Sequence, residues 1–113
     1  MVKKEIYNDD DHVYEICIGQ NRFENWEIID DSDNTDLWFH IENLPSCHVI
    51  LKCDETIKPS KKVIKRCAYL CKINTNSAKS LAKCNVLYTP ISNIEKTRIV
   101  GEVHASHCKI VQV

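Results

Sequence analysis

The sequence predicts a single α+β domain, built on a mixed or mainly antiparallel sheet with one long and one short helix. Residues 36–52 alternate in polarity on both sides of an Asn-Leu-Pro-Ser turn, which is the pattern of a strand–turn–strand unit. Residues 61–74 carry apolar side chains at helical spacing. The chain has 113 residues and is 43% apolar, which suffices for one domain with its own core, and we assign residues 1–113 to it.

The first third of the chain is predicted to hold one strand and the short helix. Val13–Ile18 has the pattern of a strand, and Gly19 is expected to end it because glycine readily adopts positive φ. Asn25 is a suitable N-cap, which predicts a helix over residues 26–31. The acidic residues 30–36 are then expected to form a loop that leads into the central strands.

The two central strands are predicted to have one core face and one polar face. If they pair across the turn, His40 and His48 lie at a similar depth beside it. The side chains expected on the core face are Leu37, Phe39, Ile41, Val49 and Leu51. Those expected on the opposite face are Trp38, His40, His48 and Lys52.

The second half of the chain is predicted to begin with the long helix and to end in strands. The buried face of a helix over residues 61–74 is expected to comprise Val63, Ile64, Cys67, Leu70 and Cys71. Its opposite face is expected to carry Lys62, Lys65, Arg66, Tyr69 and Lys72. A strand over residues 85–89 and a polar loop over residues 91–98 follow, and strands over residues 100–105 and 109–113 are predicted to form a terminal hairpin.

Charge is distributed unevenly along the chain, although the net charge is only −1. Residues 1–57 hold 14 acidic and 4 basic side chains, whereas residues 58–113 hold 2 acidic and 11 basic ones. This asymmetry indicates either contact with a polyanion or an acidic and a basic surface that attract each other within the fold. An acidic surface from the first half is also compatible with a basic protein partner.

The basic face of the long helix is the main candidate for nucleic-acid contact. Its residues Lys62, Lys65, Arg66, Tyr69 and Lys72 are joined in this prediction by Lys58, Lys61, Lys79 and Lys83. Most of these cations are lysines, which act as point charges, so sequence-independent contact with the phosphate backbone is favoured over base recognition. The alternative interpretation is a helix face that is simply solvated.

The polar face of the central strands is a second candidate for nucleic-acid contact. An exposed Trp38 could stack on an unpaired base, while His40, His48 and Lys52 could bind a phosphate or ribose. The structural alternative places Trp38 in the core with its indole N–H bonded to an acceptor. In that interpretation the two histidines bond to each other or to the turn.

The sequence does not indicate a catalytic or metal site. The seven cysteines are odd in number and form no C-x-x-C pair, so we expect free thiols packed as small apolar groups. Cys47 and His48 are neighbours on one strand and therefore point to opposite faces, which prevents a direct thiol–imidazole pair. The spacing of His40, His48 and His104-x-x-His107 is too loose for a zinc site. We predict no enzyme, no catalytic residue, no metal and no cofactor.

The sequence also contains no membrane or export signal. No apolar run approaches the roughly 18 residues that a membrane-spanning helix needs. The N-terminal residues lack the apolar segment of a secretory signal. We therefore expect no membrane contact and a location in the cytoplasm or, alternatively, the nucleus.

Three motifs resemble the NFACT RNA-binding domain (NFACT-R) family. They are Gly19–Asn25, Asp36–His40 and Pro45–Leu51, which match the family's G-x-N segment, D-[LIV]-W-F-H motif and P-G/S-x-H-V run. Further segments in family order are Ala68–Cys71, Val86–Thr89, Ser92–Lys96 and Gly101, so the resemblance covers nearly the whole chain. Two departures are Trp26, where the family has Asp, and Ser46-Cys47, where a Gly is replaced.

The resemblance implies a non-catalytic nucleic-acid-binding module. The family occurs in ribosome quality-control factors that engage tRNA and the large ribosomal subunit. It also occurs as the stand-alone domain of eukaryotic coiled-coil-domain proteins, which this chain resembles most. We therefore expect binding to RNA, either tRNA or ribosomal RNA, in translation or ribosome quality control. The alternatives are a DNA-binding module and a protein-interaction subunit that contacts no nucleic acid.

Overall fold

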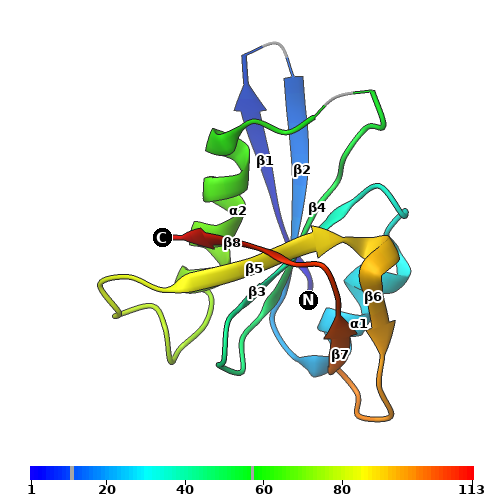
Figure 1. The fold of residues 1–113 in the computed structure, drawn as a ribbon, viewed down its shortest axis with the longest axis vertical. Helices are drawn as coiled ribbons and strands as arrows, with labels where there is room; N and C mark the ends of the chain where they lie inside the picture. Colours follow the sequence, from blue (N-terminus) through cyan, green and yellow to red (C-terminus); the bar gives the residue numbers. More distant parts are fainter. Residues whose placement is uncertain (11, 57) are drawn as a thin grey trace.

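A six-stranded antiparallel sheet forms the centre of the molecule, in the order β1-β2-β4-β3-β5-β8 (Figure 1). The structure is a computed structural model, and it describes residues 1–10, 12–56 and 58–113. All the strand pairings in this sheet are antiparallel, and the predicted α+β class is confirmed. The strands are β1 (Lys3–Asp9), β2 (His12–Gly19), β3 (Leu37–Ile41), β4 (His48–Leu51), β5 (Asn85–Pro90) and β8 (Lys109–Gln112).

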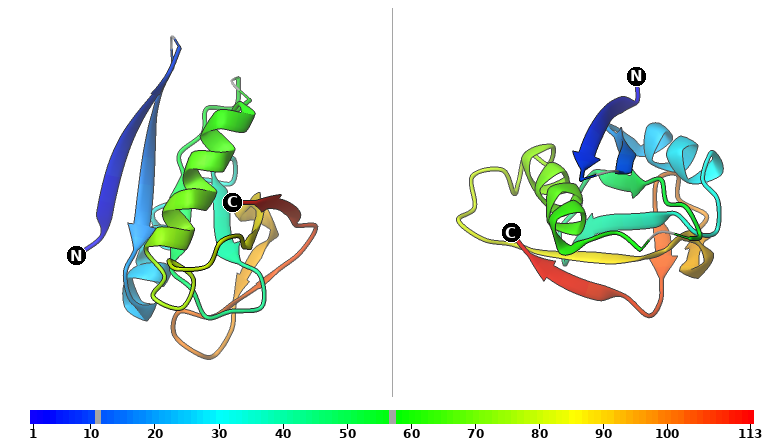
Figure 2. Two further views of the ribbon diagram at one scale, coloured as in Figure 1. Left: turned by 90° about the vertical axis from the view of Figure 1, so that its left-hand side faces the viewer. Right: turned by 90° about the horizontal axis from the view of Figure 1, so that it is seen from above.

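The two faces of the sheet are covered by different elements (Figure 2). The long helix α2 (Lys61–Ile73) packs on one face, where it buries the larger part of the core. The other face carries α1 (Arg22–Asp30) and a small sheet made of β6 (Ile94–Lys96) and β7 (Val103–Ala105). A 3-10 turn, η1 (Ile91–Asn93), connects β5 to β6.

The predicted alternation of the central strands is confirmed, but both faces are buried. Phe39 and Val49 are paired in register and contribute to the core under α2. Trp38 and Ile50 are the next pair and point to the opposite face, where Ile28 of α1 covers them. The expected polar face is therefore a second, smaller core, because α1, η1 and β6–β7 fold over it.

The short helix begins four residues earlier than predicted. Asn21, not Asn25, is the N-cap, and its Oδ1 accepts hydrogen bonds from the backbone N–H groups of Phe23 and Glu24 at 3.0 and 2.9 Å. Asn25 is instead buried, and its Oδ1 accepts from the backbone N–H of His48 at 3.1 Å. A Cβ at Gly19 would lie 2.4 Å from this amide oxygen, so the glycine provides room for Asn25 rather than a positive φ.

The long helix agrees with its prediction almost to the residue. The Ser60 Oγ accepts from the backbone N–H of Val63, and Asn74 caps the C-terminal end. The predicted inner face is buried except for Ile64, which is half-buried. Within residues 1–10, 12–56 and 58–113, no helix is long and apolar enough to span a membrane.

The prediction of a terminal hairpin is wrong. The strand β7 pairs with β6 in the small sheet, whereas β8 pairs with β5 and extends the main sheet. Non-local backbone bonds decide this arrangement, since Cys84 and Val113 exchange N–H···O bonds of 2.8 and 3.0 Å. The edge strand β1 was not predicted, because its sequence KKEIYND is mostly polar and it contributes few core side chains.

Candidate nucleic-acid interface

Trp38, His40 and His48 form one aromatic cluster beside the β3–β4 turn. Pairing of Phe39 with Val49 places His40 opposite His48, as predicted, and their ring centroids are 5.2 Å apart. The Trp38 Nε1–H donates to the His48 Nδ1 at 3.1 Å. The His40 ring stacks on the indole at 5.5 Å with an interplanar angle of 13°. The cluster thus contains one internal hydrogen bond, while the His40 Nδ1 lies 2.6 Å from the backbone oxygen of Ile41.

Burial makes this cluster neutral rather than cationic. Trp38 and His48 are each 3% exposed, and desolvation lowers the pKa of His48 to about 3, with a further contribution from the neighbouring His40. Burial also lowers the pKa of His40. Neither imidazole carries a positive charge near neutral pH, and a phosphate would gain no ion pair from them. The structure places Trp38 and His48 inside the protein, so the predicted contact with nucleic acid does not fit these two side chains.

His40 remains accessible from one groove. It lines a cavity of about 600 Å³ between the β3–β4 turn and the segment that connects β6 to β7. Arg22 and Val100 lie at the same cavity. Trp38 and His48 also line this cavity, but each is 3% exposed, whereas the half-buried His40 presents the most surface of the three to a ligand.

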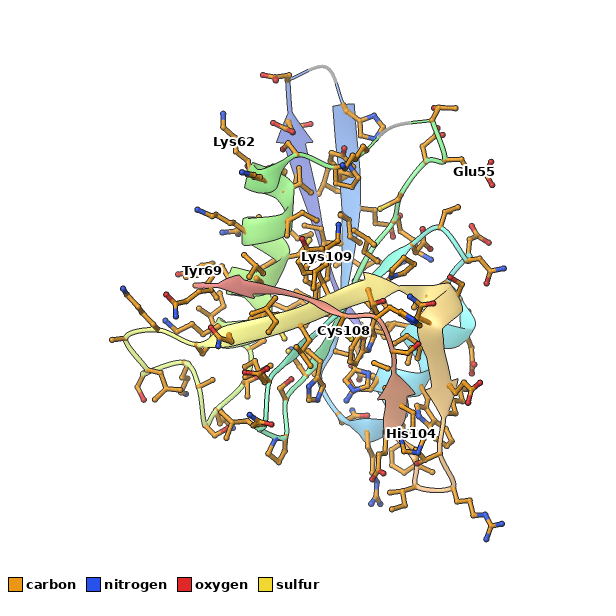
Figure 3. All side chains as sticks on the ribbon, viewed as in Figure 1. Glu55, Lys62, Tyr69, His104, Cys108 and Lys109 are labelled. Carbon is orange, nitrogen blue, oxygen red and sulfur yellow. The ribbon has the colours of Figure 1, made fainter. Side chains whose placement is uncertain are left out.

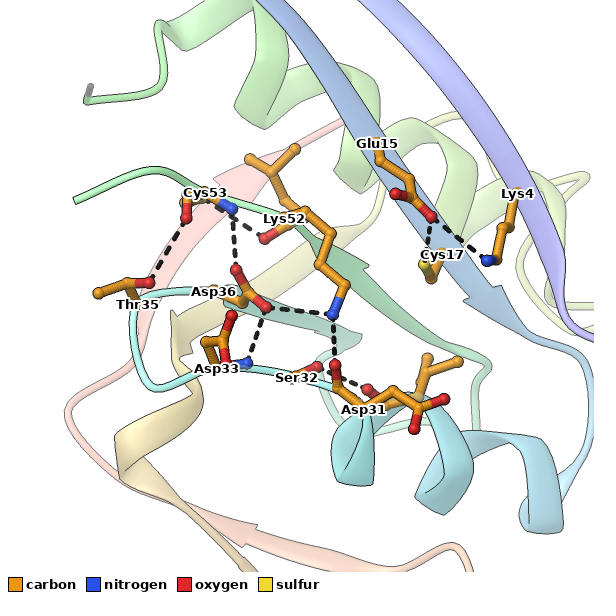
Figure 4. Close-up of polar contacts among 12 residues, drawn as sticks. Lys4, Glu15, Cys17, Asp31, Ser32, Asp33, Thr35, Asp36, Lys52 and Cys53 are labelled. Carbon is orange, nitrogen blue, oxygen red and sulfur yellow. Dashed lines mark hydrogen bonds and ion pairs between the residues drawn. The ribbon is translucent and has the colours of Figure 1, made fainter. Parts of the chain in front are cut away.

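The Lys52 side chain is bonded to the loop that precedes β3 (Figure 4). Its Nζ donates to the backbone oxygen of Asp31 at 2.6 Å and lies 3.3 Å from the Asp36 carboxylate. Asp36 is 1% exposed and also accepts from the backbone N–H groups of Asp33 and Cys53. A buried carboxylate needs such partners. Lys52 is therefore committed to Asp36 and lies apart from the basic helix.

The outer face of α2 presents most of the predicted cationic residues (Figure 3). Lys62, Lys65 and Tyr69 are exposed. Arg66 is bound by Glu5 of β1 through two hydrogen bonds of 2.8 and 2.6 Å, and its guanidinium lies 5.6 Å from the Tyr69 ring centroid. This pairing neutralises Arg66 and makes it a weaker candidate for phosphate contact than its lysine neighbours.

The segment after α2 carries further cations. Lys72, at the end of the helix, is half-buried and donates to the backbone oxygen of Ala82 at 3.5 Å. Lys79 and Lys83 are exposed in the connection to β5. Among the described residues, exposed lysines of the second half that form no ion pair are Lys58, Lys61, Lys62, Lys65, Lys79, Lys83 and Lys109. We call this set the open lysines.

A second groove lies between α2 and the edge of the main sheet. It has a volume of about 570 Å³ and is lined on the helix side by Lys61, Ile64 and Lys65, and on the sheet side by Tyr88 and Lys109. Tyr88 and Lys109 were not predicted to meet. The β5–β8 register brings them opposite each other, and the expected terminal hairpin had assigned residues 109–113 to a different partner.

Among the described residues, no hydrogen bond joins a cysteine to a histidine, as a thiolate nucleophile would need. All seven are free, and the Cys47 Sγ lies 3.9 Å from the Cys71 Sγ in the core under α2. The hydrogen bond between the two thiols lowers the pKa of Cys47 and raises that of Cys71. His48 faces the opposite side of the sheet. In the described part of the chain, no three His, Cys, Asp or Glu side chains converge as metal ligands.

The fold and its open lysines define a small α+β domain with a cationic helix face. A family model described as the NFACT protein RNA binding domain matches residues 3–106. The chain belongs to this family, and the resemblance inferred from its motifs is confirmed. Membership in an RNA-binding family supports a nucleic-acid-binding role.

Relatives of known sequence and structure agree with this assignment. Coiled-coil domain-containing protein 25 of Mus musculus is 37% identical over an alignment of 105 residues, which covers 88% of this chain and 50% of that protein. Protein JLP2 of Saccharomyces cerevisiae is 33% identical over an alignment of 102 residues, which covers 80% of this chain and 47% of that protein. The chain thus spans about half the length of these relatives.

A solved structure shares the fold. The C-terminal part of the fibronectin/fibrinogen-binding protein from Streptococcus suis superposes with a TM-score of 0.85. The match covers 97% of this chain and 45% of that chain at 24% sequence identity. At this identity the likeness shows the architecture.

Proposed function

We propose that this protein binds RNA non-catalytically through the outer face of α2 and the Lys79–Lys83 connection. The observation that carries the proposal is the set of open lysines, which no acidic side chain neutralises in the part of the chain that the structure describes. Phosphate groups of RNA supply the missing negative charge. The family description supports RNA as the polyanion.

The chemistry of this surface favours contact with the RNA backbone. Lysine ammonium groups bind phosphates as point charges, and such contacts carry little sequence information. Structured RNA such as tRNA or ribosomal RNA suits a surface of this kind, and translation or ribosome quality control is the setting we propose. The seven free thiols are in keeping with a reducing compartment, so we propose the cytoplasm, with the nucleus as the alternative.

DNA is the nearest rival ligand, because a backbone-directed lysine surface also fits its phosphates. A purely protein-binding role is the other rival, and the exposed acidic residues Glu27, Asp31 and Asp33 around the end of α1 would carry it. These acids lie on the face of the sheet opposite α2, so the two surfaces can be altered separately.

Titration of four labelled ligands at two salt concentrations tests the proposal. The ligands are tRNA, single-stranded RNA, and single-stranded and duplex DNA. We expect the RNAs to bind more tightly than DNA of the same strandedness and length, with affinity falling steeply as salt rises. Tighter binding to duplex DNA would favour the first rival. Absence of binding to every nucleic acid at low salt would exclude the proposal.

A further inference from the structure

The groove between α2 and the β5–β8 edge differs from the rest of the cationic surface. It is concave and combines an apolar floor with a cationic rim. The floor includes Leu37, Ile64, Tyr88 and Val111, and the rim includes Lys58, Lys61, Lys65 and Lys109. No acidic side chain lines it among the described residues. Its volume of about 570 Å³ lies within the range of small-molecule sites.

Tyr88 gives this groove a rigid aromatic surface. In the β5–β8 register it pairs with Lys109, so both side chains project to the face that α2 covers. Its ring stacks on Phe39 with centroids 5.4 Å apart and an interplanar angle of 17°. Phe39 is fully buried and cannot move aside. The half-buried Tyr88 ring is therefore held in place where it meets the groove.

An aromatic ring surrounded by lysines fits the two chemical parts of a nucleotide. A base stacks on the ring or packs against apolar side chains, while the phosphates contact the cations. An acidic peptide would use the lysines but has no flat group in every residue to cover Tyr88. A nucleic-acid duplex would use the lysines too, but its bases are enclosed in the stack.

We propose that this groove holds one unpaired nucleotide of single-stranded RNA, with the base against Tyr88 and Ile64 and the phosphates on Lys61, Lys65 and Lys109. This inference rests on the proposed function, because it assumes that RNA reaches the α2 surface. It adds a preference for bases that are free to leave a stack. Duplex regions contact the outer lysines only.

The test compares two oligomers that carry the same charge. One is oligouridylate and the other is its abasic counterpart. Both are about ten nucleotides long, which is within the usual site size for single strands. The protein is expected to bind oligouridylate at least about fivefold more tightly than the abasic oligomer, because only the former supplies bases for stacking. Polyglutamate of equal charge is the competitor that reports simple polyanion binding.

Three variants locate the effect. Tyr88→Leu removes the ring and should abolish the preference for oligouridylate, whereas Tyr88→Phe should retain it. Lys62→Gln alters an open lysine outside the groove and should weaken both oligomers while leaving their affinity ratio unchanged. Thermal unfolding of each variant shows whether the fold is kept.

A measurement on the unmodified protein covers the case in which Tyr88→Leu does not fold. Oligouridylate that contains 4-thiouridine is crosslinked by light and the attachment sites are mapped by mass spectrometry. We expect crosslinks at the groove residues Tyr88, His107 or Lys109. Crosslinks confined to residues outside the groove would overturn the inference.

The outcomes separate this inference from the proposed function. Equal affinity for oligouridylate and abasic oligomer, or a preference that survives in Tyr88→Leu, removes the nucleotide site but leaves backbone binding intact. If polyglutamate competes as strongly as oligouridylate, the nucleotide site is likewise excluded and backbone binding is left intact. If neither oligomer nor any structured RNA binds, the proposed function fails and this inference fails with it.

Discussion

The aromatic cluster and the outer face of α2 both contain residues predicted to contact nucleic acid. They differ in burial, in charge and in how far their polar groups are already bonded within the protein. The cluster of Trp38, His40 and His48 is largely buried, neutral and bonded internally. The α2 face is exposed and retains cations without partners among the described residues. In both regions the types of side chain in the sequence suggested contact with nucleic acid. Only the burial of these side chains and the ion pairs they form show which region is open to such a ligand.

The two regions are therefore expected to have different roles. The cluster joins β3 and β4 under α1 and stabilises the sheet. The α2 face adds little to stability, since its lysines contact solvent, and in the proposed function it supplies the charge that binds RNA. Changes in the cluster should therefore affect the free energy of unfolding, and changes on α2 should affect RNA affinity.

Substitution of Trp38 should have the largest effect. Trp38→Ala removes a large buried ring and leaves the His48 Nδ1 without its donor, so the free energy of unfolding is expected to fall by about 3–5 kcal/mol. Urea denaturation measures this loss. Trp26→Ala is the matched control, because Trp26 is only half-buried and donates to the Glu102 backbone oxygen near the surface. A Trp38→Ala loss no larger than that of the control would contradict the structural role of the cluster.

Acid should weaken the fold through His48. Its pKa is about 3 in the folded protein and 6.5 as the reference value, so the unfolded chain binds a proton that the folded chain excludes. Stability is therefore fully present above about pH 6.5 and falls by about 1.4 kcal/mol per pH unit as the pH drops toward 3. His40 acts in the same direction, because burial lowers its pKa also.

The pH effect is measured by urea denaturation between pH 7 and about pH 4, where the expected loss reaches about 3 kcal/mol. His48→Gln keeps an acceptor for the Trp38 indole but cannot titrate. Its unfolding free energy should depend less on pH over this range than that of the unmodified protein. Parallel pH profiles for the two proteins would show that His48 is not the titrating group.

Charge reversal on α2 should have the largest effect on binding. Lys62→Glu with Lys65→Glu is expected to weaken RNA binding roughly 25-fold at low salt, about fivefold for each lost phosphate contact. The free energy of unfolding should change by less than about 0.5 kcal/mol, because both side chains are exposed. Fluorescence anisotropy with labelled tRNA gives the affinity.

The control for this experiment is Arg98→Glu, which alters an exposed cation on the segment between β6 and β7, away from α2. It should change RNA affinity by no more than about twofold. If the control and the α2 variant lose affinity equally, the binding surface is not the one proposed.

Loss of the Glu5 carboxylate that binds Arg66 should slightly raise RNA affinity, whereas charge reversal on α2 lowers it. Glu5→Gln removes the carboxylate that binds the Arg66 guanidinium. Stability is expected to fall by at most about 1 kcal/mol, as for other partly exposed ion pairs. RNA affinity should rise, since the arginine becomes available and one negative charge is lost. Weaker RNA binding by Glu5→Gln would mean that the ordered Arg66–Glu5 pair itself contributes to the interface.

The local pattern of the sequence predicts the α2 face well. A period of 3.6 residues places Lys62, Lys65 and Tyr69 away from the buried Val63 and Cys67, and the structure agrees. The alternation of residues 37–41 and 48–51 likewise predicts the two faces of the central strands. Both features depend only on the geometry of one element.

Features that depend on distant partners could not be predicted in this way. The burial of His48 requires α1 and the β6–β7 pair to cover its face, and no local pattern indicates this cover. Asn21 and Asn25 are both good N-caps, and the contact between Asn25 and the His48 backbone decides between them. The groove around Tyr88 exists only because β8 joins β5 rather than its predicted hairpin partner.

The salt dependence of RNA binding tests the central claim most directly. The slope of log association constant against log salt concentration reports how many phosphates are neutralised, at about 0.7 for each phosphate of a single strand. The neutral variant Lys62→Gln with Lys65→Gln is predicted to lower the magnitude of this slope by about 1.4 relative to the unmodified protein. An unchanged slope would show that RNA, if bound, is held by charges elsewhere on the molecule.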